Sequence, residues 1–186
     1  LTGETSLEEA LAQRRSVRDF SEGELTTAEL GQLLWAAQGV TGAHGYRTAP
    51  SAGALYPLDV YAVTADGLYH YEVAQHALAI LARTDLRPAL REAALRQAAV
   101  GRAPALFVIA AVYERTEVKY GAERGPRYVH LEAGHAAQNL LLQAVALGLG
   151  AVPIGAFDDA GVQQALGLPA EQQPLYLIPV GPITQP

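Results

Sequence analysis

The chain has 186 residues, of which half are hydrophobic and only 17% are charged, and its formal net charge is −6. This acidic balance argues against a general nucleic-acid-binding protein, so any anion site must be a local cluster of positive charge. The absence of cysteine excludes disulfides, thiolate nucleophiles and cysteine-based metal or iron–sulfur sites. No apolar run reaches transmembrane length and no signal peptide is visible, so we expect a cytoplasmic protein with one domain over residues 1–186.

Two amphipathic helices are predicted near the N-terminus. The segments Ser6-Leu7-Glu8-Glu9 and Thr26-Thr27-Ala28-Glu29 both have the pattern of a capping box, which starts a helix. Gly39 is expected to end the second helix.

A compact cationic segment, Arg14-Arg15-Ser16-Val17-Arg18, follows the first helix and holds three guanidiniums and a hydroxyl within five residues. Planar, permanently charged guanidiniums with several donors suit a phosphate group. Taken alone, the segment also fits a solvated basic cluster. The phosphate interpretation therefore depends on the rest of the chain.

A second candidate segment lies in the irregular stretch of residues 40–57. Its core, Arg47–Pro57, is rich in small residues and nearly uncharged. Such a loop lets the backbone approach a flat ligand closely, although an ordinary connection with turn residues fits equally well.

The middle of the chain predicts a hairpin, two helices and a buried strand. Residues 58–64 and 68–71 are expected to be strands joined by a turn at Asp66-Gly67. A short helix is expected around residues 75–82, and a longer one from Asp85 to about Val100. The continuous apolar run of residues 105–112 is typical of a strand that is buried on both faces.

A polar loop is predicted over residues 113–126, and it contains the adjacent pair Lys119 and Tyr120. A buried lysine can lose its proton near neutral pH, so the pair has acid–base potential. The alternative is a solvated cation beside a packing aromatic ring.

The longest helical pattern covers residues 128–147 and is apolar on almost every side. A helix that is apolar all round is buried all round, so in a chain of this size we expect a second subunit to cover it. Glu132, His135 and Asn139 lie at helical spacing and would fit a metal site. We favour a buried polar ladder instead and predict no metal.

The last third of the chain predicts a glycine-rich strand over residues 148–155, a short helix that ends at Leu166 and a strand over residues 175–181. The glycine-rich stretch lacks the Gly-Lys-Ser/Thr of a Walker motif, and it is not a GxGxxG that opens a helix, so nicotinamide binding of the Rossmann type is unsupported. The order of elements predicts an α+β fold with one mixed sheet.

Along nearly its full length the chain resembles the nitroreductase superfamily of FMN flavoproteins, and within it the SagB-type dehydrogenase branch. The segments that carry the resemblance are Arg14–Phe20, Arg47–Pro57, Lys119–Gly121, Glu132–Asn139 and Gly148–Phe157. Each is weak alone, but their order and spacing together are hard to obtain by chance. The resemblance implies a three-layer nitroreductase-like fold and a homodimer with FMN and the long helix at the subunit interface.

The resemblance also implies roles for individual residues. The FMN phosphate and ribityl chain would be held by Arg14, Ser16 and Arg18, with Arg15 beside the pyrimidine end of the flavin. The other subunit would place four residues against the isoalloxazine ring, namely Pro50, Ser51, Ala52 and Gly53. Backbone near the redox nitrogen would come from Pro153, Ile154 and Gly155. Substrate deprotonation, which a Lys-Tyr pair performs in azole-forming members, would fall to Lys119 and Tyr120.

Three departures from the family pattern bear on these roles. Ala54 stands where many nitroreductases have asparagine, and Gly155 stands where an acidic residue is often found; both favour the dehydrogenase-like branch. Many members also have a basic residue near the C-terminus that reaches the phosphate, and this sequence has none. Phosphate binding is therefore expected to rest on Arg14–Arg18, with Arg127 as a further candidate.

The first functional expectation is an FMN-dependent oxidoreductase that oxidises a small or peptidic substrate, such as an azoline ring. One alternative is an NAD(P)H-dependent reductase of nitroaromatics or quinones. Another is a flavin-binding, non-catalytic subunit of a modification complex. We expect no nucleic-acid or membrane partner.

Overall fold

The computed structural model describes residues 3–183, and its centre is a six-stranded sheet with strand order β3-β2-β1-β4-β6-β5. The strands are β1 (Leu58–Thr64), β2 (Gly67–Glu72), β3 (Ala77–Ala82), β4 (Ala105–Val112), β5 (Leu149–Ala151) and β6 (Gln172–Pro182). Every neighbouring pair in this order is antiparallel, so the prediction of a mixed sheet was wrong in this detail. The helical crossover from β4 to β5 does make these two strands parallel, but β6 inserts between them and runs antiparallel to both.

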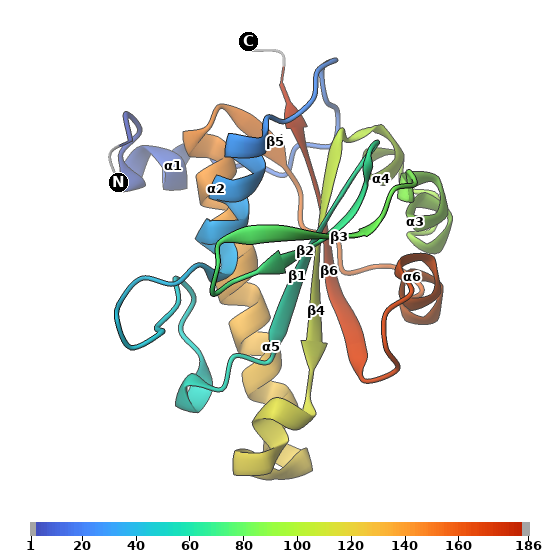
Figure 1. Cartoon of the computed structure of the whole chain (residues 1–186). Coiled ribbons are helices and arrows are strands. Elements are labelled where there is room, and N and C mark those ends of the chain that lie inside the picture. Colours follow the sequence, from blue (N-terminus) through green and yellow to red (C-terminus); the bar gives the residue numbers. More distant parts are fainter. Residues whose placement is uncertain (1–2, 184–186) are drawn as a thin grey trace.

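Helices cover both faces of the sheet and give the expected three layers (Figure 1). One face carries α2 (Thr27–Gln38) and α5 (Glu114–Ala146), with α1 (Leu7–Gln13) beside α5. The other face carries α3 (Arg87–Ala93), α4 (Ala98–Arg102) and α6 (Asp159–Leu166). Side chains of β4 contribute alternately to the two cores, with Phe107 and Ile109 on the α5 side and Leu106 and Val108 on the other. The prediction that this strand is buried on both faces is confirmed.

The two N-terminal helices begin and end where the sequence predicted. Ser6 Oγ accepts from the Glu9 amide at 3.1 Å, while the Glu9 carboxylate accepts from the Ser6 amide at 2.8 Å. Thr26 and Glu29 form the same reciprocal pair. These side chains satisfy backbone donors that have no partner inside a helix. Gly39 is the C-cap of α2, and a Cβ there would lie 2.1 Å from Trp35 Cδ1.

Three predicted elements were wrong. Residues 77–82 form strand β3 rather than a helix, because pairing with β2 overrides the helix preference of their alanines and leucines. The helix expected over residues 85–100 is divided into α3 and α4 by Leu95 and Arg96, whose φ angles are 55° and 59°.

The third correction concerns residues 113–126, which are helical and form the first part of α5 rather than a loop. Gly121 kinks the helix with φ 75° and ψ 162°, a conformation that strongly favours glycine. Gly125 lets the chain after the kink pack closely on the chain before it, because a Cβ there would lie 2.8 Å from Glu117 Cγ. Gly121 and Gly125 therefore mark a bend between two helical segments.

Among the helices that the structure describes over residues 3–183, none combines the length and the apolar character that a membrane span requires.

Candidate functional site

The cationic segment lies against the edge strand β5. The Val17 amide donates to the Ala151 carbonyl at 3.0 Å, and Ser16 forms an isolated parallel bridge with Ala151. Gly150 permits this approach, since a Cβ there would lie 2.7 Å from Val17 Cγ1 and 2.5 Å from Ile183 Cγ2. The segment that carries Arg14, Arg15 and Arg18 is therefore fixed by its backbone.

The guanidiniums of this segment are available to a ligand. Arg15 Nη1 donates to the carbonyls of Ala12 and Arg14 at 2.9 and 2.7 Å, and Arg18 Nη1 makes a long 3.5 Å contact with the Ser16 carbonyl. Within residues 3–183, none of the three arginines forms an ion pair with a carboxylate. Such unneutralised cations on a fixed backbone suit a phosphate.

A pocket of about 490 Å³ opens beside this segment. Its wall combines Arg14 and Arg15 with all of β5, with Leu141 and Val145 near the end of α5, and with Gly148, which follows that helix. The pocket thus has a basic rim and an apolar floor, a combination that fits a ligand with an anionic group on an apolar body.

Residues Pro153–Gly155 continue the chain directly beyond β5. Ile154 is buried and exchanges backbone hydrogen bonds with Leu177 of β6 at 2.8 and 2.9 Å. Gly155 is exposed. The three residues therefore follow the strand that lines the pocket and are held to the sheet.

A second group of predicted residues meets at the other end of α5. The short 3-10 helix η1 (Ala52–Ala54) lies beneath Lys119 and Tyr120, and a Cβ at Gly53 would lie 2.9 Å from Lys119 Nζ and 3.0 Å from the Tyr120 hydroxyl. The Lys119 amine is also 5.6 Å from the centre of the Tyr120 ring, which packs edge-on against Tyr128. An amine and a phenol therefore converge on backbone that carries no side chain.

The loop under this pair is bent by its own hydrogen bonds. Ser51 Oγ accepts from the Tyr56 amide at 2.9 Å, and the Ser51 carbonyl accepts from the Ala54 amide at 3.0 Å. Gly53, Ala54 and Tyr56 have φ angles of 64°, 54° and 48°. Pro50 is exposed at the start of this bend, and Ala52 is half-buried.

Within one chain the two groups lie far apart (Figure 1). Gly148, beside the cationic segment, follows the end of α5, whereas Lys119 lies in its first part. The 25 residues from Ala122 to Ala146 correspond to roughly 37 Å of helix. Arg127 is exposed near the Lys119 end and so lies far from the Arg14–Arg18 pocket of its own chain.

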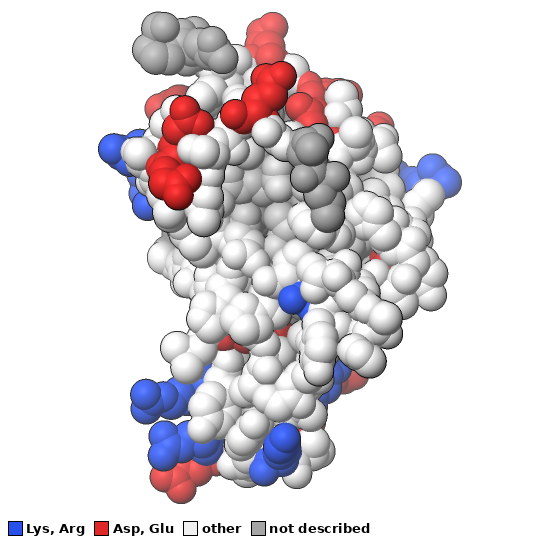
Figure 2. All heavy atoms as spheres, turned by 90° about the vertical axis from the view of Figure 1, so that its left-hand side faces the viewer, with Lys and Arg blue, Asp and Glu red and all other residues white. Residues whose placement is uncertain are grey.

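The face that bears α1, α2 and the 40–57 loop has an uneven charge distribution (Figure 2). Acidic side chains gather at one end and basic ones at the other, with mostly uncharged surface between them. Large apolar side chains are exposed on α1 and α5, including Leu11 at 53% and Leu131 at 51%. The single chain therefore covers only one side of α5.

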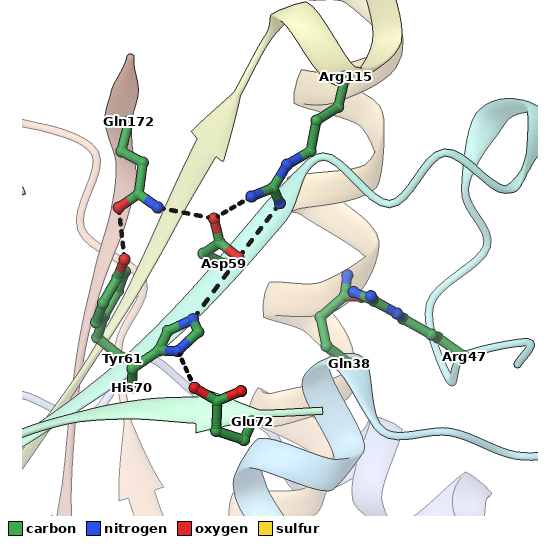
Figure 3. A network of polar contacts seen from close by, with 8 residues as sticks. All are labelled: Gln38, Arg47, Asp59, Tyr61, His70, Glu72, Arg115 and Gln172. Carbon is green, nitrogen blue, oxygen red and sulfur yellow. Dashed lines mark hydrogen bonds and ion pairs between the residues drawn. The ribbon is translucent and has the colours of Figure 1, made fainter. Parts of the chain in front are cut away.

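A polar network that was not predicted from the sequence lies at the ends of β1 and β6 (Figure 3). Asp59 accepts two hydrogen bonds from Arg115 at 2.9 and 3.2 Å and one from Gln172 at 2.9 Å. His70 Nε2 lies 3.7 Å from the same carboxylate. Because Arg115 precedes Lys119 by one helical turn, the network ties the Lys119 end of α5 to the sheet. The signal for this network in the sequence was Asp59, a charged residue inside the otherwise apolar strand of residues 58–64.

This network shifts the pKa values of its members. Burial opposes ionisation of Asp59, but the contacts with His70 and Arg115 outweigh it, so the pKa of Asp59 falls below its usual value. The contact with Asp59 raises the pKa of His70 against the opposing effect of burial. Burial and the charge of Asp59 raise the pKa of Tyr61, whose hydroxyl donates to Gln172, to about 12.

The helical triad considered as a metal site does not form one. Glu132 is buried, His135 is exposed, and the Asn139 amide donates to the Thr48 carbonyl at 3.2 Å. Over residues 3–183 no group of three or more His, Cys, Asp or Glu side chains is arranged to hold a metal ion. The polar ladder is therefore formed by Glu132 and Asn139, without His135.

Comparison with known proteins places this geometry in a family. The family model described as "Nitroreductase family" matches residues 11–182. MJ1384 of Methanocaldococcus jannaschii, which carries the name of a nitroreductase, is 44% identical over 184 residues, covering 96% of this chain and 91% of the relative. The trifolitoxin-processing protein TfxB of Rhizobium leguminosarum bv. trifolii is 34% identical over 123 residues, which are 59% of this chain and 32% of TfxB.

Solved structures agree with the sequence comparison. A nitroreductase from Ralstonia eutropha superposes with a TM-score of 0.88 and 29% identity, over all of this chain and 86% of that one. A nitroreductase from Desulfovibrio desulfuricans, solved in complex with FMN, gives a TM-score of 0.73 at 24% identity over 98% of this chain and 88% of that one, which shows likeness of fold. The chain belongs to the nitroreductase family of flavin-dependent oxidoreductases.

Proposed function

We propose that this chain is an FMN-dependent oxidoreductase that binds its flavin between two copies of itself. The observation that carries the proposal is the separation of the two groups of predicted residues along α5. One flavin can contact both groups only if one chain supplies Arg14–Arg18 with Pro153–Gly155 and its partner supplies Pro50–Gly53. The FMN found in the Desulfovibrio neighbour supports the choice of flavin.

The residues present fit FMN in chemical character. Arg14, Ser16 and Arg18 offer donors to a phosphate, and Arg15 adds a further cation at the rim of the pocket. Gly53 carries no Cβ, which lets Lys119 Nζ and the Tyr120 hydroxyl lie against the backbone of the segment that would face the ring. When bound, FMN supplies hydride or electron transfer, while the protein orients the substrate.

A homodimer is supported by the surface that α1 and α5 leave uncovered. The middle of this face is largely uncharged (Figure 2), and depletion of charge is typical of the core of an interface. Leu11 and Leu131 would lose their solvent exposure there. The same association would cover the second side of α5.

The substrate class that we favour is a small or peptidic molecule oxidised in the manner of the SagB-type dehydrogenases. Lys119 Nζ and the Tyr120 hydroxyl converge over Gly53, where one of them can accept a proton from a substrate held against the ring. The similarity to TfxB, which is named a trifolitoxin-processing protein, supports this class. The 44% identity to MJ1384 favours the second candidate, an NAD(P)H-dependent reductase of nitroaromatics or quinones.

The first experiment identifies the chromophore of the purified protein. We expect a yellow protein that releases one FMN per chain and elutes as a dimer; a colourless protein that takes up no added FMN would refute the proposal. Reduction of the bound flavin by NADH or NADPH without oxygen would support the reductase. Flavin that neither a nicotinamide nor any azoline peptide reduces would indicate the non-catalytic subunit.

The variant Lys119→Met then separates the two catalytic candidates. Substrate oxidation that needs proton removal should fall by 10²–10⁴-fold, the usual contribution of a general base. Reduction of a quinone by NAD(P)H needs no proton from the substrate and should be largely retained. Equal loss of both activities, or of neither, would contradict the assignment of Lys119.

A further inference from the structure

Glu132 is a carboxylate buried in the apolar part of α5, with 2% of its surface exposed. Gln38, at the last residue of α2, is fully buried beside it and donates from Nε2 to Glu132 Oε1 at 3.3 Å. A buried carboxylate is costly unless it is paired, so its neighbours show what holds it there.

Every polar neighbour of Glu132 is oriented as a donor. Gln38 and Arg47 lie next to each other in Figure 3, and Gln38 Oε1 accepts from Arg47 Nη1 at 3.0 Å. The nitrogen of the Gln38 amide therefore faces Glu132. Ser51 also lies close enough to Glu132 to favour its ionised form and to lower the pKa of that carboxyl. Because Ser51 Oγ already accepts from the Tyr56 amide, its own hydrogen is free for the carboxylate. Glu132 is therefore the common acceptor.

The contacts close into a ring around the 47–56 loop. The Arg47 guanidinium lies 4.4 Å from the centre of the Tyr56 ring, and the Tyr56 amide donates to Ser51. Both ends of the loop are thus tied to each other, and Gln38 ties Arg47 to Glu132, while Ser51 lies beside the same carboxylate. Ala54 and Tyr56 have positive φ angles that L-residues rarely adopt, so this backbone requires such support.

We infer that Glu132 is a positioning residue: it holds the 47–56 loop in the bend that presents Pro50–Gly53 and places Gly53 beneath Lys119 and Tyr120. The inference rests on the proposed function only where it assigns Pro50–Gly53 to the flavin. The attachment of the loop to α5 and α2 belongs to the chain itself and is measurable without flavin.

The test exchanges the glutamate and the glutamine at positions 132 and 38, which reverses the donor and the acceptor of the hydrogen bond between them. In Glu132→Gln the introduced amide has one acceptor oxygen for two donors, and rotating the Gln38 amide would break its bond with Arg47. Gln38→Glu places two carboxylates side by side. In the double variant Gln38→Glu/Glu132→Gln, the carboxylate at position 38 accepts from Arg47 and from the amide at position 132, whose oxygen accepts from Ser51.

The measurement is amide hydrogen exchange of residues 47–56 in the flavin-free protein. Exchange of the Tyr56 amide should be about tenfold faster in Glu132→Gln, since a hydrogen bond to a charged group is lost, and should return close to the wild-type rate in the double variant. The exposed Glu171→Gln is the matched control and should leave this exchange unchanged. Gln38→Ala removes the amide that links Glu132 to Arg47 but leaves the Tyr56–Ser51 hydrogen bond in place, so it should also speed exchange and provides a second test if Glu132→Gln does not fold.

The FMN dissociation constant and the visible spectrum of bound flavin are measured on the same proteins. A loosened loop should weaken FMN binding several-fold and change the spectrum, with both restored in the double variant. Unchanged exchange in Glu132→Gln and Gln38→Ala, or a double variant no better than the single ones, would overturn the inference. Altered exchange with unaltered flavin affinity and spectrum would instead overturn the placement of Pro50–Gly53 against the ring.

Discussion

The amine of Lys119 lies directly over Gly53, so closely that a Cβ added to the glycine would come within 2.9 Å of Nζ. Gly121 kinks α5 just after Lys119, and the first part of the helix lies over the 40–57 loop. Because the two residues are so close, a substitution at Gly53 tests whether Lys119 must lie over this loop.

Gly53→Ala should destabilise the protein by about 1–2 kcal/mol, because a Cβ is strained at the φ of 64° found there. The melting temperature should fall by about 2–4 °C per kcal/mol, measured at fixed protein concentration. The Lys119 side chain can move aside, so substrate oxidation should fall further than stability suggests. Ala54→Gly is the control: its φ of 54° is relieved by glycine, and a loss of stability equal to that of Gly53→Ala would contradict the argument.

Gly150→Ala should displace the cationic segment from β5, since its Cβ would lie within 3 Å of both Val17 and Ile183. We expect FMN to bind at least about tenfold more weakly, the cost of losing one good charge-assisted hydrogen bond. Titration of the flavin-free protein with FMN measures the change. Gly42→Ala, where a Cβ meets nothing within 4 Å, should bind FMN normally. Equal affinities for the two variants would show that Arg14–Arg18 does not hold the phosphate.

Asp59→Asn should lower the free energy of unfolding by about 2 kcal/mol near pH 6, because charge-assisted hydrogen bonds from Arg115 and Gln172 lose their acceptor. The lowered pKa of Asp59 means that its contribution is present above pH 3.8 and is lost as pH falls through the folded value. The raised pKa of His70 means that its contribution is complete below pH 6.5 and is lost as pH rises through the folded value.

The stability difference between wild type and Asp59→Asn should therefore be largest between these two pH values and narrower on either side. Urea unfolding at a series of pH values measures it. Asp66→Asn, at an exposed hairpin turn, should show no such maximum. A difference that stays constant from pH 4 to pH 9 would exclude the coupling with His70.

The contribution of Glu132 to the free energy of unfolding should change with pH in the opposite direction to that of Asp59. Burial raises the pKa of Glu132 above 4.5, although contacts with Ser51, Gln38 and Arg47 act against it. The unfolded chain then loses this proton at lower pH than the folded chain, so the wild type loses stability as pH rises from 4.5 to the folded value. Glu132→Gln cannot titrate and should lack that slope. Parallel stability curves for the two proteins over this range would show that the carboxyl is not perturbed by burial.

Local sequence determined much of the secondary structure. Both capping boxes start helices because Ser6 and Thr26 each reach a backbone amide three residues away. The strand of residues 105–112 is buried on both faces because it has no polar side to expose. The residues of the candidate site were predicted from the order and spacing of the five segments that resemble the nitroreductase superfamily. The local helix and strand patterns do not identify them.

Long-range pairing decided what the local patterns left open. Residues 77–82 have the composition of a helix but become a strand because β2 offers its hydrogen-bonding edge. Lys119 was expected in a loop, but Gly121 concentrates the bend in one residue and leaves helix on both sides. The first result depends on a partner strand and not on nearby residues, whereas the second depends on one glycine two positions from Lys119.

By itself, the sequence determined the caps, the buried strand and the chemical groups available for a flavin, since each depends on neighbours a few residues apart. Only the tertiary structure decided that Gly53 lies under Lys119, that Asp59 accepts from Arg115, and that Glu132 accepts from Gln38. These contacts join residues separated by 56 to 94 positions, and the orientation of the Gln38 amide is set by a third residue, Arg47, which the sequence does not identify as its partner.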